Sequence, residues 1–538
     1  MSKVAKYLQD HIRGDVSVSA QKRRHFADDC SALRQLPQII ISPIDEQDVR
    51  KITRFAWQLA ERGRVLPIVT RGAGTDMSGA SIGQEIVLAT EPHLSRILEF
   101  DDKHHRVTVE PGANFGKLQH TLTFSHSSFI PAYPTSIAYS TIGGAIANNS
   151  GGERSLRYGT MSNFVESLRV VLANGDVINT GRITKKEVSR KKGLSTFEGE
   201  IYRAVDGLLS ENPDTVASYD VPSRGGVGYN LKSIRADNGS VDLTPLFVGS
   251  QGTLGVIVQA VVSTEVYKPD ISKLIFILKD RSSLDTLSAK LLADKTINIE
   301  YVDASMIELA RREHTTFLAN EIGEELPAGV LLAEFAKMSN RTLDKLVKKY
   351  YKVFADSGVV LIEQDKDVDF VAEKLKALPN FLLAQQFGVA QLVPGIDDAM
   401  VPQGSVDEFL NLAEQLFKKA NVSVSVHGRV GEGIIHAYPL IDLSQLGDRQ
   451  KLQRLTADYY KLVLSVQGSI VGEYGAGRTR GAFAREQLGD VLFELMHRVK
   501  QIFDPYGIFN PGVRVDVDPK ANLSLLGVDY DIPQLHHN

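Results

Sequence analysis

The chain has 538 residues, of which 43% are hydrophobic and 23% charged, with a formal net charge of −4 at pH 7 and one cysteine, Cys30. This length exceeds what a single hydrophobic core serves and predicts two or three domains of ordinary globular composition. The lack of a basic excess argues against a nucleic-acid partner, and one cysteine excludes an internal disulfide and a cysteine-ligated iron–sulfur cluster within this chain.

The N-terminal stretch, residues 1–17, contains no apolar core of the kind that signal peptides have. A run of about 18 apolar residues, long enough to cross a bilayer, occurs nowhere in the sequence. We therefore expect neither a signal peptide nor a membrane-spanning helix, and we expect a cytoplasmic location.

The first elements form a strand–helix–strand pattern. Gln38–Ser42 is a β-branched run that predicts a strand, and apolar residues at helical spacing predict a helix over Glu46–Arg62 that Gly63 ends. A second strand is predicted over Val65–Val69. The sequence thus predicts an α+β nucleotide-binding unit, with further strands at Ile86–Ala89, Arg106–Val109, Leu168–Leu172 and Gly255–Val262 and a helix at Phe115–Phe124.

Three glycine-rich stretches, Pro67–Gly79, Pro134–Gly159 and Gly249–Ile257, stand out along this region. Glycines at this density indicate positive φ or close approach of the backbone to a ligand, and free backbone N–H groups bind anions such as a pyrophosphate. For any one stretch alone, an ordinary loop is an equal alternative. No GxGxxG with a following acidic residue and no Walker loop is present, so Rossmann and P-loop signatures are missing.

In order, Arg71–Thr75, Thr141–Ala145 and Gly249–Gly255 resemble the FAD-binding, PCMH-type domain of the vanillyl-alcohol oxidase superfamily, in its glycolate oxidase and D-lactate dehydrogenase branch. The resemblance runs from about Pro37 to Pro269 and returns near the C-terminus. It implies a flavoprotein oxidoreductase whose FAD-binding residues are Arg71, Gly72, Ala73, Gly74, Thr75, Met77, Ser78, Gly79, Pro134, Thr135, Ser140, Thr141, Gly143, Gly144, Asn148, Gly151, Tyr158, Gly159, Gln251, Gly252, Gly255, Ile257 and Asn510.

The resemblance also bears on how FAD is held. Thr75 stands near the position at which relatives that tether FAD through a histidine carry that residue, and Cys30 is remote from the glycine-rich stretches. We therefore expect non-covalent FAD.

The pattern resets after Pro269. Strands are predicted from Leu274 to Asp280, over Val330–Ala336 and from Val359, with helices over Ser283–Ala293 and Arg341–Asp356. This alternation predicts an antiparallel sheet with helices on one face. In the resembling family, such a domain is the cap that covers the flavin.

The predicted fold is α+β, a two-part FAD-binding domain of the vanillyl-alcohol oxidase type with an inserted antiparallel-sheet cap domain. Its expected parts are an FAD-binding domain over 1–269 (N-terminal extension 1–36, core 37–269), a cap over 270–468 and a C-terminal return over 469–538. A last helix, Phe483–Phe503, is predicted to bury one stripe, made of Leu488, Val491, Leu492, Leu495, Val499 and Ile502.

Four residues are the catalytic candidates. In the 2-hydroxy acid branch one motif reads His-x-Gly-Asp-Gly-Asn-x-His and another Gly-Glu-His-Gly. Residue by residue, this sequence retains His436 and Glu473, but Arg429 replaces the first histidine and Tyr474 the catalytic one, while Ile434 replaces the asparagine. The family's mechanism therefore does not transfer unchanged.

Arg429 predicts an anion site without a metal, because its permanent positive charge repels a divalent ion. Its planar fork suits a substrate carboxylate or phosphate, while a surface salt bridge is the simpler alternative. Some members of the resembling branch bind a divalent metal with both histidines of the first motif and the glutamate of the second. His427 lies two residues from Arg429 and is either a substitute for the missing metal ligand or an ordinary strand residue.

Tyr474 is a poor base at its ordinary pKa near 10 unless Arg478 or Arg480 stabilises its phenolate. Tyr474 could instead orient the substrate by a hydrogen bond, or its ring could simply pack against neighbouring side chains. Ile396 stands about where the hydroxyglutarate-type branch carries a basic residue for carboxylates, so the substrate is not necessarily a familiar one.

The sequence as a whole predicts an FAD-dependent oxidoreductase that transfers hydride from a 2-hydroxy acid of the D-lactate or glycolate type to flavin. Two alternatives remain: an alkyl-glycerone-phosphate synthase-like FAD transferase, and a non-catalytic flavin-binding subunit. The expected partners are a small anionic substrate and an unidentified electron acceptor, with a homo-oligomer possible.

Overall fold

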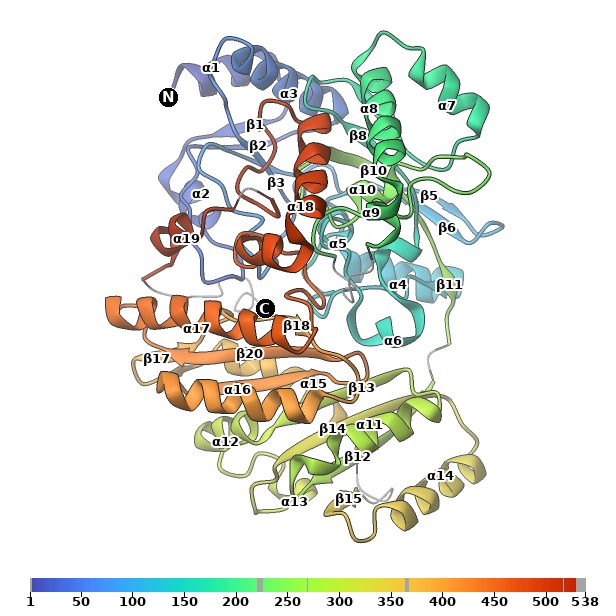
Figure 1. The fold of residues 1–538 in the computed structure, drawn as a ribbon, viewed down its shortest axis with the longest axis vertical. Coiled ribbons are helices and arrows are strands. Elements are labelled where there is room, and N and C mark those ends of the chain that lie inside the picture. Colours follow the sequence, from blue (N-terminus) through green and yellow to red (C-terminus); the bar gives the residue numbers. More distant parts are fainter. Residues whose placement is uncertain (1, 220–225, 269, 363–366, 516, 529–538) are drawn as a thin grey trace. The chain divides into compact units, whose positions relative to one another are not determined.

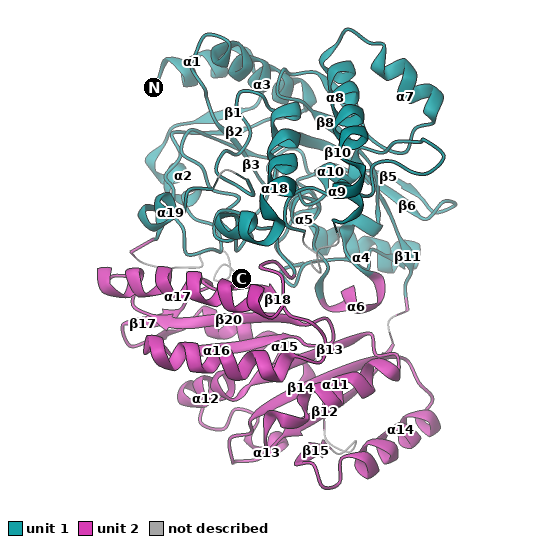
Figure 2. Cartoon of the chain, in the orientation of Figure 1, with its two compact units in different colours: residues 1–152, 159–267, 473–526 teal, residues 153–158, 268–472, 527–538 magenta. Residues whose placement is uncertain are grey.

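The chain is divided into two units, which Figure 2 shows in different colours. The computed structural model describes residues 2–219, 226–268, 270–362, 367–515 and 517–528. Unit 1 comprises residues 1–152, 159–267 and 473–526, and unit 2 comprises residues 153–158, 268–472 and 527–538. Unit 1 is thus built from chain segments on both sides of the main part of unit 2.

A mostly parallel sheet of order β1-β2-β4-β3 lies in unit 1 (Figure 1). Strands β2, β3 and β4 are parallel because α3 (Glu46–Ala60) crosses between β2 and β3 and buries Val49, Ile52 and Ala56 in the shared core. The second predicted strand, Val65–Val69, begins three residues too early, because β3 begins at Ile68 and Val65 is 46% exposed. The strands are β1 Asp15–Ser17, β2 Ile39–Ser42, β3 Ile68–Arg71 and β4 Ile86–Ala89.

A second sheet of unit 1, antiparallel and of order β5-β6-β10-β8-β9, follows. Its central strand β10 alternates buried and half-buried residues after three buried ones, as expected for a strand packed on one face. The strands are β5 Ile97–Asp101, β6 Arg106–Val109, β8 Val165–Val171, β9 Val177–Asn179 and β10 Val256–Ser263, and β7 Ser128–Phe129 pairs separately with β11 Glu265–Val266.

The helices of unit 1 surround these sheets. The 3₁₀ segments η2 (Met161–Asn163) and η4 (Gly481–Phe483) lie in this unit. The α-helices are α1 Lys3–His11, α2 Ala20–His25, α3, α4 Phe115–His126, α5 Ile142–Asn148, α7 Lys185–Lys192, α8 Phe197–Glu211, α9 Pro213–Ala217, α10 Thr244–Phe247, α18 Ala484–Phe503 and α19 Pro519–Leu525.

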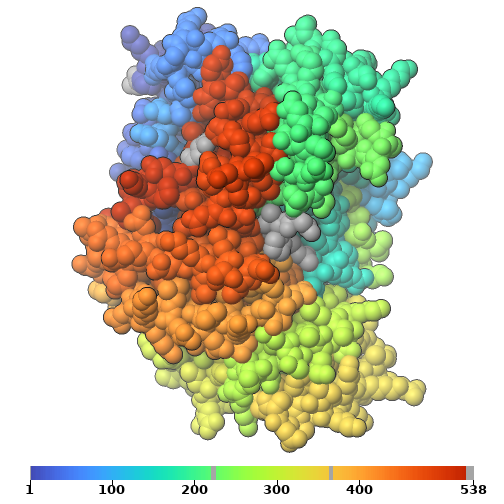
Figure 3. Space-filling model, in the orientation of Figure 1, coloured from blue at the N-terminus to red at the C-terminus, as the bar shows by residue number. Residues whose placement is uncertain are grey.

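Helix α18 is interrupted near its start. Gly489 has φ 73° and ψ 164°, which is not helical, and Val491 just beyond it is 65% exposed. The prediction of one unbroken apolar stripe that includes Val491 is therefore wrong, because the chain is not helical at Gly489 and Val491, directly beyond this break, faces solvent. The later turns pack beside α8, and the two helices lie side by side at the surface in Figure 3.

Unit 2 contains one large antiparallel sheet of order β15-β12-β14-β13-β19-β20-β17-β16, with β18 paired to β20. The predicted α+β fold class is confirmed, while Glu363, at the end of the strand predicted from Val359, lies outside the described residues. The strands are β12 Ile271–Leu278, β13 Asn298–Asp303, β14 Gly329–Ala336, β15 Val359–Leu361, β16 Gln386–Phe387, β17 Ala390–Leu392, β18 Ala399–Met400, β19 Val424–Arg429 and β20 Ile434–Ile441.

Helices flank the sheet of unit 2, and α16 and α17 run next to each other (Figure 1). None of the helices within the described ranges of either unit is long and apolar enough to cross a bilayer. The remaining elements are η1 Gly152–Arg154, α6 Ser155–Tyr158, η3 Arg281–Ser283, α11 Leu284–Ala293, α12 Ala304–Glu313, α13 Ala319–Ile322, α14 Asn340–Val353, α15 Val368–Leu383, α16 Val406–Ala420 and α17 Leu446–Ser465.

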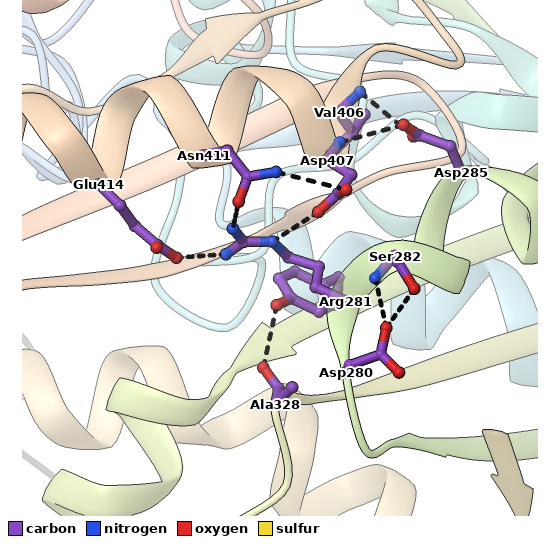
Figure 4. A network of polar contacts seen from close by, with 10 residues as sticks. Asp280, Arg281, Ser282, Asp285, Ala328, Val406, Asp407, Asn411 and Glu414 are labelled. Carbon is purple, nitrogen blue, oxygen red and sulfur yellow. Dashed lines mark hydrogen bonds and ion pairs between the residues drawn. The ribbon is translucent and has the colours of Figure 1, made fainter. Parts of the chain in front are cut away.

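A polar network joins the start of α11 to α16 (Figure 4). Arg281 donates to Asp407 at 2.8 Å, to Asn411 at 2.7 Å and to Glu414 at 2.5 Å. Asp285 in turn accepts from the first two amides of α16, at 3.2 and 3.1 Å. Because the Arg281 side chain is only 15% exposed, these charge-assisted bonds are partly shielded from water and fix the two helices together.

We expect Arg281→Ala to lower the free energy of unfolding of unit 2 by about 2 kcal/mol, since it removes three bonds to one guanidinium. Urea unfolding monitored by circular dichroism measures this loss. Arg312→Ala is the matched control, because Arg312 forms an exposed pair with Glu308 that contributes less than about 1 kcal/mol. Equal effects of the two substitutions would contradict this account of Figure 4.

Candidate functional site

A pocket in unit 1 is formed by all three glycine-rich stretches and Tyr474. It encloses about 930 Å³ including the open solvent at its mouth, within the range of small-molecule sites. The predicted FAD-binding residues that line it are Gly72, Ala73, Gly74, Thr75, Pro134, Ser140, Thr141, Gly143, Gly144, Asn148, Gln251, Gly252, Gly255 and Ile257.

The other predicted FAD-binding residues do not line this pocket. Tyr158 belongs to unit 2, whereas Ser78 and Asn510 are buried in unit 1 and bond to the glycine-rich stretches. The residues outside the pocket lining are Arg71, Met77, Ser78, Gly79, Thr135, Gly151, Tyr158, Gly159 and Asn510.

Arg71 supports the first stretch. Its guanidinium is buried and donates to the carbonyl oxygens of Phe26 and Asp28 at 3.4 and 2.6 Å. Gly74 passes so close that a Cβ there would lie 2.2 Å from Nη2 of Arg71, and its φ of 76° also favours glycine. Burial lowers the pKa of Arg71. Arg71 therefore fixes the path of the loop.

Backbone amides without a hydrogen-bond acceptor lie in the first stretch. Among the described residues, no acceptor takes a hydrogen bond from the backbone N–H groups of residues 72–75. In contrast, the first three amides of α5 are taken: Ile142 donates to Ala113 O, Gly143 to Pro111 O, and Gly144 to the hydroxyl of its N-cap, Thr141. The expectation of free amides in Pro134–Gly159 does not hold at the start of α5, whose N–H groups are satisfied by protein.

Two residues of the pocket lining have buried hydroxyl groups without a hydrogen-bond partner. Oγ of Ser140, in a side chain that is 97% buried, and Oγ1 of Thr70 have no hydrogen-bond partner within the described residues. Gly252 has φ 71°, and the nearest atom to a Cβ placed there is 3.9 Å away, so this wall of the pocket is open. Free amides, free hydroxyls and side-chain-free walls fit a dinucleotide such as FAD.

A hydrogen-bond network joins the stretches at the wall of the pocket. Gln251 donates from Nε2 to Asn148 and Ser78, each at 2.9 Å, and its Oε1 accepts from the amide of Gly477 at 2.9 Å. Asp76 accepts from Asn148 at 3.0 Å and from the Ser78 hydroxyl at 2.8 Å. The three glycine-rich stretches and the C-terminal segment are thereby held as one framework.

No histidine or cysteine lines the pocket within the described residues. The expectation that Cys30 is remote from the glycine-rich stretches is wrong, because its backbone N–H donates to Asp76 O of the first stretch at 2.9 Å. Its side chain is nevertheless buried and does not line the pocket, and burial raises the pKa of its thiol to about 12. A protonated thiol is a poor nucleophile. These facts support the prediction of non-covalent FAD.

One face of the unit 2 sheet carries a stripe of polar side chains. The cross-strand pairs are Asn298 with Glu334, Val302 with His427, and His427 with His436. Residues two apart on a strand share a face, so Glu300 and Arg429 lie on this face too. We call these residues (298, 300, 334, 427, 429 and 436) the polar stripe.

His436 forms a short contact with a carboxylate. Its Nδ1 lies 2.6 Å from Oδ1 of Asp397, and both side chains are almost fully buried. An ionised carboxylate can only accept, which in a neutral imidazole places the proton on Nδ1 and makes Nε2 the acceptor nitrogen. His427 stacks on His436, with ring centroids 4.7 Å apart.

Arg429 is 95% buried, which excludes the surface salt bridge weighed from the sequence. Its Nε donates to Glu432 at 3.2 Å, and Glu432 also accepts from the hydroxyl of Ser155 at 2.8 Å. The ion pair compensates the buried charge and fixes the plane of the guanidinium.

The four catalytic candidates divide between the units: Glu473 and Tyr474 belong to unit 1, and Arg429 and His436 to unit 2. Tyr474 is a lining residue of the pocket, and Glu473 is buried. No group of three or more histidine, cysteine, aspartate or glutamate side chains suited to a metal occurs in the part of the chain that the structure describes. The metal-free site remains a prediction.

Sequence reasoning missed several polar residues near these candidates. Asp397 orients His436, and Lys376 bonds to Glu334 and Glu153 at 2.7 Å each. The available signal was a charged residue in an otherwise apolar strand, as at Glu334 in VLLAEFA. The cross-strand partner of such a residue depends on the register, which the sequence leaves open.

Two matches to protein families decide the family. Residues 37–181 match the family described as FAD binding domain, and residues 284–513 match the C-terminal domain of FAD linked oxidases. The chain belongs to the FAD-linked oxidases. The predicted family and the FAD cofactor are confirmed.

This FAD-linked oxidase is 27% identical to D-2-hydroxyglutarate dehydrogenase of Haemophilus influenzae, over 97% of this chain and 52% of that protein. It thus spans about half the length of the D-2-hydroxyglutarate dehydrogenases that it matches first. Glycolate oxidase subunit GlcD of Bacillus subtilis is 26% identical, with 89% of each chain covered.

Among solved structures, 4-ethylphenol oxidase from Gulosibacter chungangensis has the same fold, with a TM-score of 0.66 at 15% identity. The similarity covers 95% of this chain and 96% of that one. At such low identity the likeness concerns the fold alone.

We expect Gln251→Leu to weaken FAD binding about 30-fold, which corresponds to about 2 kcal/mol, because it leaves buried partners on three segments unsatisfied. Titration of the apoprotein with FAD, followed by flavin fluorescence, measures the dissociation constant. Gln259→Leu is the control, because Gln259 lies in the nearby strand β10 and does not line the pocket. This variant should bind FAD normally. An unchanged dissociation constant for Gln251→Leu would refute the bracing role of the network.

Glu300 predicts a pH-dependent stability. Burial is the largest cause that raises the pKa of the Glu300 carboxyl from 4.5 to about 7, and the negative charges of Glu334 and Glu153 raise it further. The positive charge of Lys376 acts in the opposite direction. Because the folded state binds the Glu300 proton more tightly than the unfolded state, the protonated carboxyl contributes stability that is fully present below about pH 4.5. This contribution is lost as pH rises through about 7.

Glu300→Gln should therefore gain stability relative to wild type between pH 5 and pH 8, by an amount of the order of 3 kcal/mol. Thermal unfolding at both pH values measures the difference. Glu308→Gln, an exposed carboxylate of the same unit, should show no such trend. If both variants track wild type across this range, the Glu300 carboxyl is not the titrating group.

Proposed function

We propose that the chain is an FAD-dependent oxidoreductase that oxidises the hydroxyl-bearing carbon of a 2-hydroxy acid. The observation that carries the proposal is the pocket of unit 1, in which the three glycine-rich stretches and Tyr474 line one cavity. The two matched families and the names of the relatives, a D-2-hydroxyglutarate dehydrogenase and a glycolate oxidase subunit, support this reaction class.

Unit 1 contributes the cofactor site. FAD, when bound, supplies the acceptor for a hydride that leaves the hydroxyl-bearing carbon. The amides of residues 72–75 and the hydroxyls of Ser140 and Thr70 are the groups that would hold it, since they are the unsatisfied donors of the pocket. Tyr474 lines the same pocket and would orient the substrate hydroxyl by a hydrogen bond.

Unit 2 contributes the base. As hydride leaves carbon, the substrate hydroxyl must lose its proton, and a side chain with a lone pair accelerates this transfer. His436 has that lone pair on Nε2 because Asp397 fixes the proton on Nδ1. Asp397 also stabilises the imidazolium that forms.

Arg429 binds the substrate carboxylate in this proposal. Its buried guanidinium is fixed by Glu432, so little side-chain entropy is lost when the carboxylate binds. Its permanent charge also argues against a divalent metal at the position.

The proposal is tested by mixing the holoenzyme anaerobically with D-lactate, glycolate or D-2-hydroxyglutarate and following the visible absorbance of FAD. We expect at least one of the acids to bleach the flavin, and its L-enantiomer, where one exists, to leave it oxidised. Unchanged spectra with all three, together with product from an acyl-glycerone phosphate and a fatty alcohol, would instead establish the transferase alternative.

We expect His436→Gln to lower kcat by about 10² to 10⁴-fold, the usual contribution of a general base. Asp397→Asn should lower kcat less and move the acidic limb of the kcat/KM profile to lower pH, because the imidazolium loses its carboxylate. Steady-state assays between pH 5 and pH 9 measure both effects.

His427→Gln is the matched control, because His427 stacks on His436 without contacting substrate in this proposal. It should keep the wild-type pH profile. A profile that is unchanged in Asp397→Asn, or shifted equally in His427→Gln, would remove Asp397 from the mechanism.

A further inference from the structure

Residues 26–31 of the N-terminal extension brace the first glycine-rich stretch, although they lie ahead of the part of the chain that matches the FAD binding domain. The guanidinium of Arg71 donates to Asp28 O at 2.6 Å. Further along the stretch, the amide of Cys30 donates to Asp76 O at 2.9 Å. The segment thus holds the stretch before and after the backbone amides that would bind the cofactor.

Asp29 of this segment carries a buried carboxylate that connects it to the pocket. Its Oδ1 accepts from the amide and the hydroxyl of Ser31, at 3.0 and 2.5 Å. Its Oδ2 accepts from the hydroxyl of Ser81 at 3.0 Å, and Ser81 lines the pocket. One hydrogen bond therefore links Asp29 to the cofactor site.

A second buried carboxylate, that of Asp76, lines the pocket itself. It accepts from the amide and the hydroxyl of Ser78, from the amide of Ala80 and from the side-chain amide of Asn148, at 2.8–3.0 Å. Four donors to one carboxylate favour its ionised form. Asp76 directly follows residues 72–75, whose amides have no acceptor within the described residues, so negative charge lies next in the chain to the expected anion site.

The charged and titratable groups that face Asp29 come from separate parts of unit 1 and are Asp76, Arg71, Arg478 and the thiol of Cys30. Burial is the largest cause that raises the pKa of the Asp29 carboxyl from 3.8 to about 7, and the negative charge of Asp76 adds to it. Hydrogen bonds from Ser31 and the positive charge of Arg71 act in the opposite direction. The thiol of Cys30 stays protonated, because its pKa is raised to about 12. Within this group of residues, Asp29 is therefore the one that exchanges a proton near neutral pH.

We propose that Asp29 links the cofactor site to the pH of the solution: the pocket binds FAD together with a proton that Asp29 takes up. An anion such as the FAD pyrophosphate adds negative charge beside Asp76, which makes a second ionised carboxylate nearby less favourable. Protonation of Asp29 removes this repulsion, and the carboxyl can then donate to the hydroxyl oxygen of Ser81. Because the link concerns FAD binding alone, it does not depend on the substrate that the enzyme oxidises.

Equilibrium titration of the wild-type apoprotein with FAD, followed by flavin fluorescence, tests this link between pH 6 and pH 8.5. The FAD pyrophosphate keeps its charge over this range. We expect the dissociation constant to rise about threefold or more with pH, because Asp29 must regain a proton as FAD binds. A dissociation constant that stays constant, or that falls as pH rises, would overturn the inference.

Proton uptake is measured directly by titration calorimetry at pH 7.5 in two buffers of different ionisation enthalpy. The apparent binding enthalpy should differ between the buffers in the direction of net proton uptake by the protein. Net release of protons, or no exchange, would contradict the link without recourse to any variant.

Asp29→Asn imitates the protonated carboxyl, because its side-chain oxygen can accept from Ser31 while its nitrogen donates to Ser81. We expect this variant to bind FAD about as tightly at pH 8.5 as at pH 6. Asp10→Asn, which removes an exposed carboxylate of the same N-terminal extension, is the control and should keep the wild-type rise. A rise that persists in Asp29→Asn would assign the proton to another group and refute the role of Asp29.

Ser31→Ala gives a second test, which does not require Asp29→Asn to fold. It removes the hydroxyl that lies 2.5 Å from Asp29 Oδ1, and this hydrogen bond favours the ionised carboxylate. The rise of the dissociation constant should therefore move to higher pH. If the rise stays at its wild-type pH, whether or not binding weakens overall, the segment only braces the stretch and Asp29 is not the linked group.

Discussion

The cofactor site depends on a single buried amide. Gln251 is held in the left-handed region at φ 52°, an unfavourable conformation for a residue with a side chain, and bonds to three separate segments. Asn510 donates to its carbonyl oxygen and to that of Ala80, which joins a fourth segment to the same point. The glycine-rich stretches have little side-chain packing of their own, so this network replaces it as the source of their rigidity.

The same network explains why unit 1 is built from distant parts of the sequence. Gly477 and Asn510 lie beyond unit 2 in the chain, yet both bond to Gln251. Lys500 of α18 likewise donates to Thr253 O at 2.7 Å. The return of the chain to unit 1 after residue 472 thus supplies hydrogen-bond partners to the pocket residue Gln251 from beyond residues 268–472.

Elements set by local pattern were predictable, and features set by tertiary contacts were not. The helix at Glu46 and the strand at Ile86–Ala89 follow from apolar periodicity, and the pocket lining follows from the glycine-rich stretches. The break at Gly489 was missed because an isolated glycine in a helical pattern is usually tolerated. Arg71 was expected at the cofactor, yet its place beneath the loop depends on the carbonyl oxygens of Phe26 and Asp28, which no local pattern reveals.

The polar stripe of unit 2 brings polar side chains from separate parts of the sequence together on one face of a sheet. Residues on four adjacent strands reach one face because register and alternation coincide, and helix α15 brings Lys376 to the same group. The sequence identified His436 and Arg429 through motif resemblance, but Asp397 and the glutamates required the pairing of strands. The stripe gathers polar and charged side chains in a buried setting, where hydrogen bonds and ion pairs are stronger than in water.

The central claim is that hydride leaves the hydroxyl-bearing carbon of the substrate for FAD. The most direct test is rapid anaerobic mixing of the holoenzyme with a 2-hydroxy acid deuterated at C2, compared with the unlabelled acid. The account predicts that flavin bleaching is slowed several-fold by deuterium and that the 2-oxo acid forms in equal amount to reduced flavin. Bleaching at the same rate with both acids, without any 2-oxo acid, would contradict it.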